Sequence, residues 1–331
     1  MPLNNDLYLG FDGGGTKTVC VLGDGQGRIL ASATGSSTNL KSRPAEQVEQ
    51  TIKGLLAQVL PESAFIKSIH VSTAGGDRSE DQSRWKTWLR NSGLNPDHLV
   101  VENDAVGALA AGTGSKNGTV LIAGTGSIAY SIRDHQAAPI RVGGWGYLFG
   151  DEGSGYDIGS KALKKIARFH DGREEIDKAF TTHVLRGLGL TSPAQIITFI
   201  YENSYPRQVI ASIAKLVLEL AQQGNPTAQS LINDAADCLT ELVFSIYRCD
   251  VKSAAFPLVV SGGLFESNFF KKQFETTMRT EGFEQTIIVP QHPPVIGSYI
   301  CALLQDGISF TEGLEHNVSQ TWKKALWREN V

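Results

Sequence analysis

The residues with the clearest chemical potential form a glycine turn after the first apolar segment. They read Asp12-Gly13-Gly14-Gly15-Thr16-Lys17. Three glycines let the backbone approach a ligand closely, so successive N–H groups can bind phosphate oxygens, and a hydroxyl and an ammonium group add donors. The carboxylate before them can hold Mg²⁺ directly or through water. An ordinary glycine hairpin is the alternative interpretation.

A second turn of the same kind reads Gly124-Thr125-Gly126-Ser127. By itself it is more typical of a plain Ser/Thr turn. Each turn, however, joins an apolar strand to a return strand, and each return strand precedes a third strand-like segment. We infer two related halves, whose turns would hold phosphates from opposite sides. Neither turn has the spacing of a P-loop or of the dinucleotide fingerprint, which disfavours both of those folds.

Asp104 directly follows an apolar strand that ends at Val101 and precedes an Ala/Gly-rich run. A carboxylate at this place is either a helix N-cap or a general base that accepts a proton from an attacking hydroxyl. Both interpretations stay open from the residues alone.

The densest feature is a glycine-rich segment, residues 143–155, which reads GGWGYLFGDEGSG. An aromatic residue flanked by glycines and followed by two acids is poor core material. Carboxylates suit bidentate hydrogen bonds to neighbouring hydroxyls, and an indole suits the apolar face of a sugar ring. An irregular capping loop is the alternative.

Hydrophobic periodicity predicts the elements that position these residues. Strands are expected at 7–12, 18–22, 28–33, 68–72, 99–101, 120–123, 128–130, 139–142, 258–260 and 286–289. Helices are expected at 44–60, 80–91, 158–169, 174–185, 209–222, 228–247, 268–281 and 295–304. The position of the repeat places a domain boundary between residues 112 and 113, giving domains 1–112 and 113–331. The last fifteen residues are given no role.

Composition limits the class of protein. A chain of 331 residues with 41% hydrophobic residues is long enough for two cores. A formal charge of -4 without long like-charge runs does not favour a nucleic-acid partner. No leader-like or membrane-spanning stretch is present, so we expect a cytoplasmic protein without a membrane partner. Four scattered cysteines predict reduced thiols.

Six motifs in this order resemble the BadF/BadG/BcrA/BcrD ATPase family, part of the sugar kinase, heat-shock chaperone and actin superfamily. They are Asp12–Lys17, Ser37–Asn39, Ala74–Asp77, Asn103–Ala105, Ala123–Ser127 and Gly143–Tyr156. The resemblance runs from about residue 8 to residue 305. It implies an α/β fold of two ribonuclease-H-like (actin-like ATPase) domains around a cleft, with a helical insertion in the second. It also implies ATP-dependent phosphorylation of a small amino sugar, with N-acetylglucosamine 6-phosphate as the expected product.

The resemblance assigns roles residue by residue. Asp104 is similar in context to the catalytic base, and Asp12 is the expected Mg²⁺ ligand. ATP and its phosphates are expected at Gly13, Gly14, Gly15, Thr16, Lys17, Thr125, Gly126, Gly224 and Gly262. The sugar is expected at Asn39, Gly76, Asp104, Gly144, Trp145, Gly146, Asp151 and Gly155.

Several alternatives follow from the same resemblance. Glucosamine, N-acetylmuramic acid and N-acetylmannosamine are not separated from N-acetylglucosamine by the sequence. A 2-hydroxyacyl-CoA dehydratase activator needs cluster-binding cysteines, and no cysteine lies between Cys20 and Cys238. A nucleotide switch without a substrate would leave Trp145 and Asp151 unexplained. A sugar-sensing transcription factor lacks a helix-turn-helix segment before Leu7. A homodimer stays an open alternative to a monomer.

Overall fold

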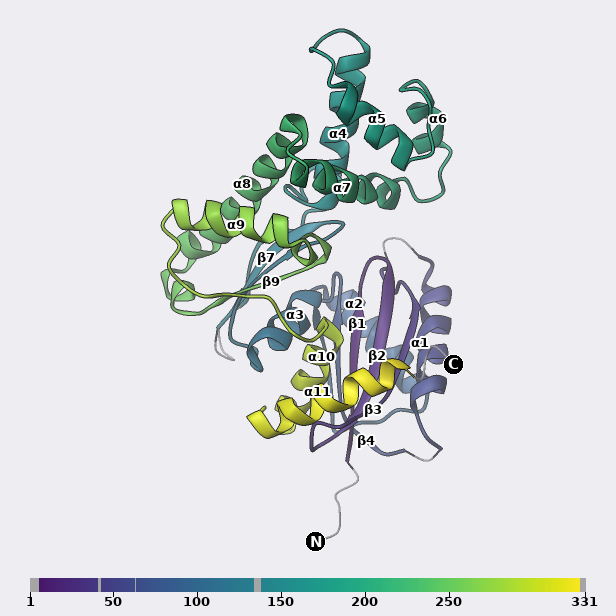
Figure 1. Ribbon diagram of the computed structural model, residues 1–331. Helices are drawn as coiled ribbons and strands as arrows, with labels where there is room; N and C mark the ends of the chain where they lie inside the picture. The colour runs from purple at the N-terminus through teal and green to yellow at the C-terminus, as the bar shows by residue number, and fades with distance from the viewer. Residues whose placement is uncertain (1–5, 41–42, 63, 134–137, 328–331) are drawn as a thin grey trace. The chain divides into compact units, whose positions relative to one another are not determined.

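The computed structural model describes residues 6–40, 43–62, 64–133 and 138–327 (Figure 1). The chain divides into two compact units. The first unit contains residues 1–118 and 290–331, and the second contains residues 119–289. Each unit is described by itself below.

The sheet of the first unit has five strands in the order β3-β2-β1-β4-β5. The strands are β1 (Leu7–Gly13), β2 (Lys17–Asp24), β3 (Ile29–Ser36), β4 (Ile66–Thr73) and β5 (His98–Asn103). β1 pairs with β2 antiparallel and with β4 parallel, and β4 pairs with β5 parallel. The carboxyl ends of β1, β4 and β5 therefore meet at one edge of the sheet, where the candidate acids lie.

Helices cover both faces of this sheet, and successive side chains of β1 point alternately to the two faces. They are α1 (Ala45–Val59), α2 (Ser79–Asn91), α3 (Asp104–Thr113), α10 (Pro294–Gln305) and α11 (Glu312–Trp327). Leu9 and Phe11 share a core with α1 and α2, and the Phe11 ring lies 5.7 Å from that of Trp85, centroid to centroid. Gly10 faces α10, where a Cβ atom would lie 2.4 Å from the Tyr299 amide nitrogen. Only glycine permits this close contact.

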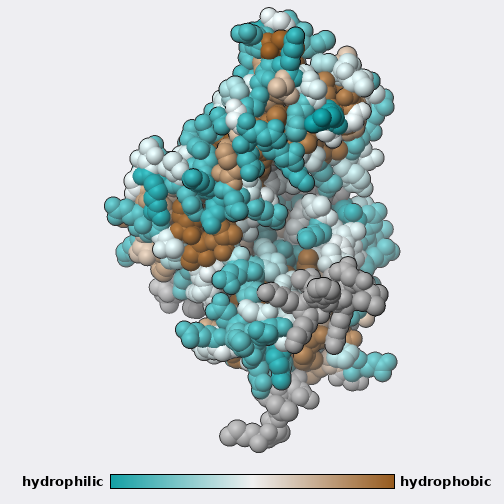
Figure 2. Space-filling model, viewed as in Figure 1, coloured by the Kyte–Doolittle hydropathy of each residue, from teal (hydrophilic) through white to brown (hydrophobic). Residues whose placement is uncertain are grey.

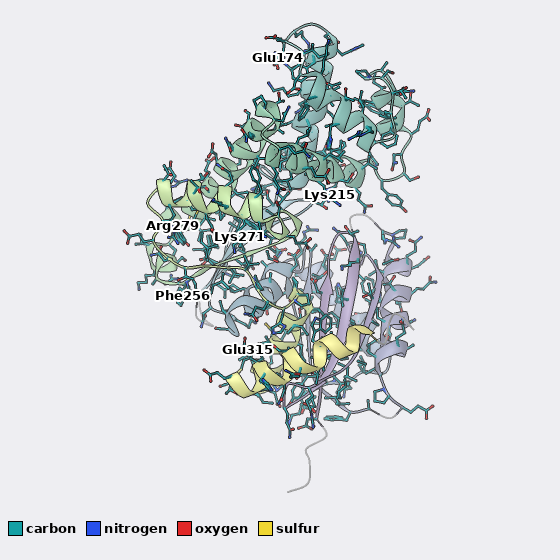
Figure 3. The ribbon with its side chains drawn as sticks, viewed as in Figure 1. Glu174, Lys215, Phe256, Lys271, Arg279 and Glu315 are labelled. Carbon is teal, nitrogen blue, oxygen red and sulfur yellow. The ribbon has the colours of Figure 1, made fainter. Side chains whose placement is uncertain are left out.

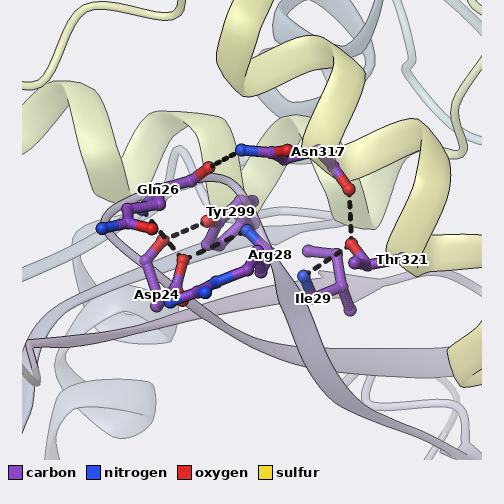
Figure 4. Close-up of polar contacts among 7 residues, drawn as sticks. All are labelled: Asp24, Gln26, Arg28, Ile29, Tyr299, Asn317 and Thr321. Carbon is purple, nitrogen blue, oxygen red and sulfur yellow. Dashed lines mark hydrogen bonds and ion pairs between the residues drawn. The ribbon is translucent and has the colours of Figure 1, made fainter.

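The C-terminal segment belongs to the first unit, whereas we had expected one domain to run from 113 to 331. Polar contacts tie it to the β2–β3 turn (Figure 4). The Tyr299 hydroxyl donates to the Asp24 carbonyl oxygen, the Asn317 amide donates to the Gln26 carbonyl at 2.8 Å, and the Ile29 N–H donates to the Thr321 hydroxyl at 2.9 Å. These contacts join residues between 275 and 292 positions apart, which local sequence patterns do not predict.

The second unit repeats the sheet of the first. Its strand order is β10-β9-β6-β7-β8, which read backwards is the order of the first sheet. The strands are β6 (Gly118–Ala123), β7 (Ser127–Ile132), β8 (Ile140–Gly143), β9 (Leu258–Ser261) and β10 (Ile287–Ile288). β6 pairs with β9 parallel and β7 with β8 antiparallel, as in the first unit. The expected duplication is thus confirmed.

A helical block separates β8 from β9, as expected. The helices of this unit are α4 (Gly155–His170), α5 (Lys178–Gly187), α6 (Gln195–Tyr201), α7 (Pro206–Gln222), α8 (Pro226–Cys249) and α9 (Asn268–Thr280), with short 3₁₀ turns at Val251–Ala255 and Gly263–Glu266. The helix expected from 174 begins at 178 because the Asp177 carboxylate caps it, accepting from the Phe180 N–H at 2.9 Å. α6 was not predicted, and it buries none of its residues.

Polar side chains cover most of the face drawn in Figure 2, while apolar ones fill a core in each unit. In the second unit this core joins Leu121 and Ala123 of β6 to α4, α7, α8 and α9. No helix in the described part of the chain has the length and apolar character needed to cross a membrane.

Candidate active site

Hydroxyl groups hold the first glycine turn by hydrogen bonds to its carbonyl oxygens. The Ser37 hydroxyl donates to the Gly14 carbonyl at 2.9 Å, and the Thr73 hydroxyl donates to the Gly13 carbonyl at 3.2 Å. A Cβ atom on Gly13 would lie 2.6 Å from the Thr38 hydroxyl oxygen. The tip is open, since a Cβ atom on Gly15 would have no heavy atom of the described chain within 4 Å. The backbone there is free to approach a ligand.

Two aspartates lie at the same edge of the first sheet. Asp12 of β1 pairs with Ser72 of β4, and the next row of the register contains Gly13, Thr73 and Asn103. Asp104 follows at once as the first residue of α3. The capping role that Asp104 was a candidate for belongs to Asn103, whose side chain accepts from the Ala105 N–H at 3.0 Å. Asp104 is therefore the first residue inside the helix and not its N-cap.

The pKa values of both aspartates are raised. Burial raises the pKa of Asp12 to about 7, with a further increase from the Asp104 charge and an opposing effect of Lys17. Burial also raises the pKa of Asp104 to about 6, against hydrogen bonds from backbone N–H groups and together with the Asp77 charge. A carboxylate with a pKa near 6 is ionised at neutral pH and basic enough to accept a proton.

α3 is fixed against α10 by glycines, and this fixes the start of α3. A Cβ atom on Gly297 would lie 1.8 Å from the Gly107 carbonyl oxygen. A Cβ atom on Gly107 would lie 2.7 Å from the hydroxyl oxygens of Ser72 and Ser298. The backbones of α3 and α10 are thus in contact, and α3 also packs closely against the end of β4. This packing fixes the position of Asp104 at the start of α3.

The two other sugar candidates of the first unit lie at this edge as well. The Asn39 N–H donates to the Ser37 hydroxyl at 3.2 Å, the same hydroxyl that holds the glycine turn. Gly76 is buried after β4, and a Cβ atom there would lie 2.0 Å from the Glu102 carbonyl oxygen. Packing alone therefore explains why residue 76 is glycine.

The second glycine turn, in the second unit, is braced by the start of α4. The Gly155 N–H donates to the Gly124 carbonyl at 2.7 Å, and the Tyr156 N–H donates to the Thr125 carbonyl at 3.3 Å. Gly262 follows β9 with a φ of 101°, and a Cβ atom there would lie 2.5 Å from the Ala123 carbonyl oxygen. The structure thus brings Gly155 and Gly262 to the turn that contains Thr125 and Gly126.

The glycine-rich segment after β8 exposes its aromatic residues and buries its first acid. Gly144 and Gly146 have φ values of 69° and 95°, which favour glycine. Trp145 is 63% exposed, and the Arg141 guanidinium lies over its ring at 5.0 Å from the centroid. Asp151 is 3% exposed. Burial raises the pKa of Asp151, and the charge of Arg207 opposes this.

Gly224 lies apart from these groups, in the turn between α7 and α8. It is exposed and has a φ of 88°, and a Cβ atom there would meet no heavy atom of the described residues within 4 Å. The end of α7 accounts for its glycine. Its expected nucleotide contact stays a prediction.

Sequence reasoning missed two kinds of supporting residue. Thr73 was not singled out, although it holds the first turn. Arg207, which pairs with Asp151, lies 56 positions away in the helical block. A signal for Thr73 existed, namely a hydroxyl at a strand end beside the expected Ala74–Asp77 motif, but none existed for Arg207.

Two sheets of identical strand order, each with a glycine turn between its first two strands, define the class: a duplicated ribonuclease-H-like fold of the actin-like ATPases. Within that class, the chain belongs to the BadF/BadG/BcrA/BcrD ATPase family, whose model matches residues 9–302. The motif-based resemblance is thereby confirmed.

Known proteins similar to this chain carry sugar kinase names. An N-acetylmuramic acid/N-acetylglucosamine kinase of Clostridium acetobutylicum is 30% identical over 89% of this chain and 97% of its own length. An N-acetyl-D-glucosamine kinase of Dictyostelium discoideum is 31% identical over 80% of this chain and 87% of its own. A crystal structure from Chromobacterium violaceum, of a candidate N-acetylglucosamine kinase, superposes with a TM-score of 0.71 at 23% identity, over 90% of this chain and 99% of that one.

Proposed function

We propose that this protein transfers the γ-phosphoryl group of ATP to the 6-hydroxyl of N-acetylglucosamine. The observation that carries the proposal is the place of Asp104 at the sheet edge where β1 leads into the first glycine turn, whose tip is open. The ATPase family and the names of two relatives of nearly equal length support the nucleotide and the sugar.

In the proposed reaction the Asp104 carboxylate accepts the proton of the attacking hydroxyl. The sugar oxygen forms a bond to the γ-phosphorus as the bond from that phosphorus to the leaving oxygen of ADP breaks. Backbone N–H groups of the two glycine turns, with Thr16, Lys17 and Thr125, are the donors that we assign to the phosphates. A base in this position contributes ~10²–10⁴ to the rate.

Asp12 is the residue that we assign to Mg²⁺. The described residues contain no group of three or more metal-ligating side chains. In nucleotide sites Mg²⁺ is held by one or two carboxylates together with waters and phosphates. The Asp104 charge, which contributes to the raised pKa of Asp12, would also attract a cation to this place. When bound with ATP, the ion neutralises phosphate charge.

We assign roles in sugar binding to Asn39, Gly76 and Asp104 and, separately, to Gly144, Trp145, Gly146, Asp151 and Gly155. An amide and carboxylates provide the hydrogen bonds that discriminate hydroxyl and acetamido groups. The exposed Trp145 provides an apolar surface for the ring. We also propose that the protein lies in the cytoplasm, where ATP is available.

N-acetylmuramic acid is a second candidate substrate because the Clostridium relative carries that name. Glucosamine is a third and would lack the acetamido group. A dehydratase activator is disfavoured because no cysteine lies between Cys20 and Cys238.

An ADP-release screen tests the proposal. The protein is assayed with Mg²⁺ and ATP against N-acetylglucosamine, N-acetylmuramic acid, N-acetylmannosamine, glucosamine and glucose. We expect the highest kcat/KM with N-acetylglucosamine. Equal ADP release with and without every sugar would instead identify an ATPase or a nucleotide switch, and preference for glucosamine would overturn the assignment of an acetamido-binding site.

A further inference from the structure

Asp151 occupies an unusual position for a charged residue. Its backbone has a φ of 60°, the only positive value for a non-glycine residue in the described chain. Its side chain is almost fully buried within the second unit. A buried carboxylate in a left-handed conformation costs free energy in two ways, so the surrounding contacts must hold it there.

One set of contacts joins Asp151 to the second glycine turn. The Ser127 N–H points to one carboxylate oxygen at 3.5 Å. A Cβ atom on Gly126 would lie 2.8 Å from the other oxygen, so the carboxylate packs directly against the turn. The next residue continues the contact, because the Ser127 hydroxyl donates to the Glu152 carbonyl at 2.6 Å. These contacts do not involve Arg207, and they hold residues 151 and 152 at the turn.

The other contact comes from the helical block. Arg207, in the first turn of α7, donates through Nη2 to Asp151 Oδ2 at 3.1 Å. Its guanidinium also lies over the Tyr147 ring at 5.1 Å from the centroid, and that ring meets Tyr156 edge-on at 5.1 Å. The Arg207 Nε is buried and has no hydrogen-bond partner among the described residues. Arg207 thus contacts the aromatic segment and the buried acid at the same time.

We propose that Arg207 is a positioning residue for sugar binding, which holds the Asp151 carboxylate in the orientation that accepts sugar hydroxyls. The inference rests on the proposed function, in which Asp151 binds the sugar. A carboxylate has room for about four hydrogen bonds, and the two protein donors leave acceptor positions for hydroxyl groups. Arg207 fixes which positions these are, and through α7 it ties the helical block to the glycine turn.

The role can be separated from a purely structural one by the pattern of kinetic constants. A buried ion pair adds little to stability on average, but removing one partner leaves the other charge unpaired. If Arg207 acts by orienting Asp151, its loss weakens sugar binding and leaves ATP binding and the chemical step largely intact. The unpaired Asp151 charge lowers the melting temperature in either case, so the kinetic constants separate the two roles: if Arg207 only supports the fold, all of them change together.

The test compares Arg207→Gln, Arg207→Lys and a control, Lys215→Gln, which removes one positive charge from an exposed position of the same helix (Figure 3). Steady-state kinetics are measured with N-acetylglucosamine and ATP varied in turn. We expect Arg207→Gln to raise the KM for the sugar about 10- to 100-fold, the range for a hydrogen bond to a charged group. The ATP KM and kcat should stay within about threefold.

Arg207→Lys should recover part of the loss, because an ammonium group keeps the charge but not the planar geometry. The control should match the wild type. A wild-type sugar KM in Arg207→Gln overturns the inference, as does an equal rise in both KM values. If Arg207→Gln fails to fold, two other variants decide. The inference is overturned when Arg207→Lys has a wild-type sugar KM and melting temperature and Arg207→Ala, purified at low temperature, binds the sugar normally by calorimetry. Absence of sugar-dependent ADP release from the wild type overturns the proposed function itself, and the two failures are thus distinct.

Discussion

Replacing Asp12 by asparagine should stabilise the protein at alkaline pH while it abolishes activity. The folded protein raises the pKa of Asp12 from 3.8 to about 7 through burial and the nearby Asp104 charge. Ionised Asp12 is therefore less stable in the folded state than in the unfolded chain. Asparagine keeps the shape and removes the charge.

The sign and size follow from proton linkage. Below pH 3.8 the carboxyl is protonated in both states and contributes no penalty, and between pH 3.8 and 7 the penalty grows until it is complete. A difference of about three pKa units corresponds to ~4 kcal/mol. Because Asp12 is only half-buried, solvent reduces this, and we expect a gain of about 2 kcal/mol at pH 8.

Urea unfolding of Asp12→Asn and the wild type at pH 8 and pH 5 measures the effect. The gain at pH 5 should be less than half of that at pH 8, because much of the wild-type Asp12 is then neutral in the folded state. Asp237→Asn, at an exposed position of α8, is the matched control and should change stability by less than about 0.5 kcal/mol. A destabilised Asp12→Asn at pH 8, or a gain that does not depend on pH, would refute the reasoning.

Three further predictions concern the same site. Asp104→Asn should lower kcat ~10²–10⁴-fold, as measured by steady-state kinetics, and near-wild-type kcat would remove Asp104 from the mechanism. The wild-type kcat/KM should fall below pH 6 as Asp104 becomes protonated, and a flat profile between pH 5 and 8 would contradict the assignment of the base. Gly76→Ala should lower the unfolding free energy by about 1–3 kcal/mol, because its Cβ would lie 2.0 Å from a carbonyl oxygen, whereas Gly15→Ala should keep stability and raise the ATP KM, and the reverse pattern would exclude an open first turn.

Local signals predicted the parts of the fold that local contacts determine. Each glycine turn follows an apolar strand and is followed by a return strand, so the hairpins of both units were evident. α6 was missed because it buries no residue and so lacks an apolar face with helical spacing. The return of α10 and α11 to the first unit was missed for another reason. Their attachment depends on contacts such as Gly10 with Tyr299, in which one residue of each pair is nearly 290 positions from the other.

In the candidate site, too, local patterns predicted some residues, whereas residues that act through distant contacts were missed. Asp12 and Asp104 were predicted because each lies in a motif at the end of an apolar strand, and the structure places them at one edge because the carboxyl ends of parallel strands meet there. The alternative roles of Asp104 could not be separated by sequence, because either Asn103 or Asp104 can cap α3. Arg207 could not be found at all, since an isolated arginine at the start of a helix carries no sign of the acid that it contacts.

The central claim is that phosphorus moves from ATP to a sugar hydroxyl on this protein. The most direct measurement is the ³¹P NMR spectrum of a reaction containing the protein, Mg²⁺, ATP and N-acetylglucosamine. We predict one new phosphomonoester signal, that of the sugar 6-phosphate, in an amount equal to the ADP formed and ~10²–10⁴-fold slower to appear with Asp104→Asn. Inorganic phosphate as the only new product, or no reaction of ATP, would contradict the account.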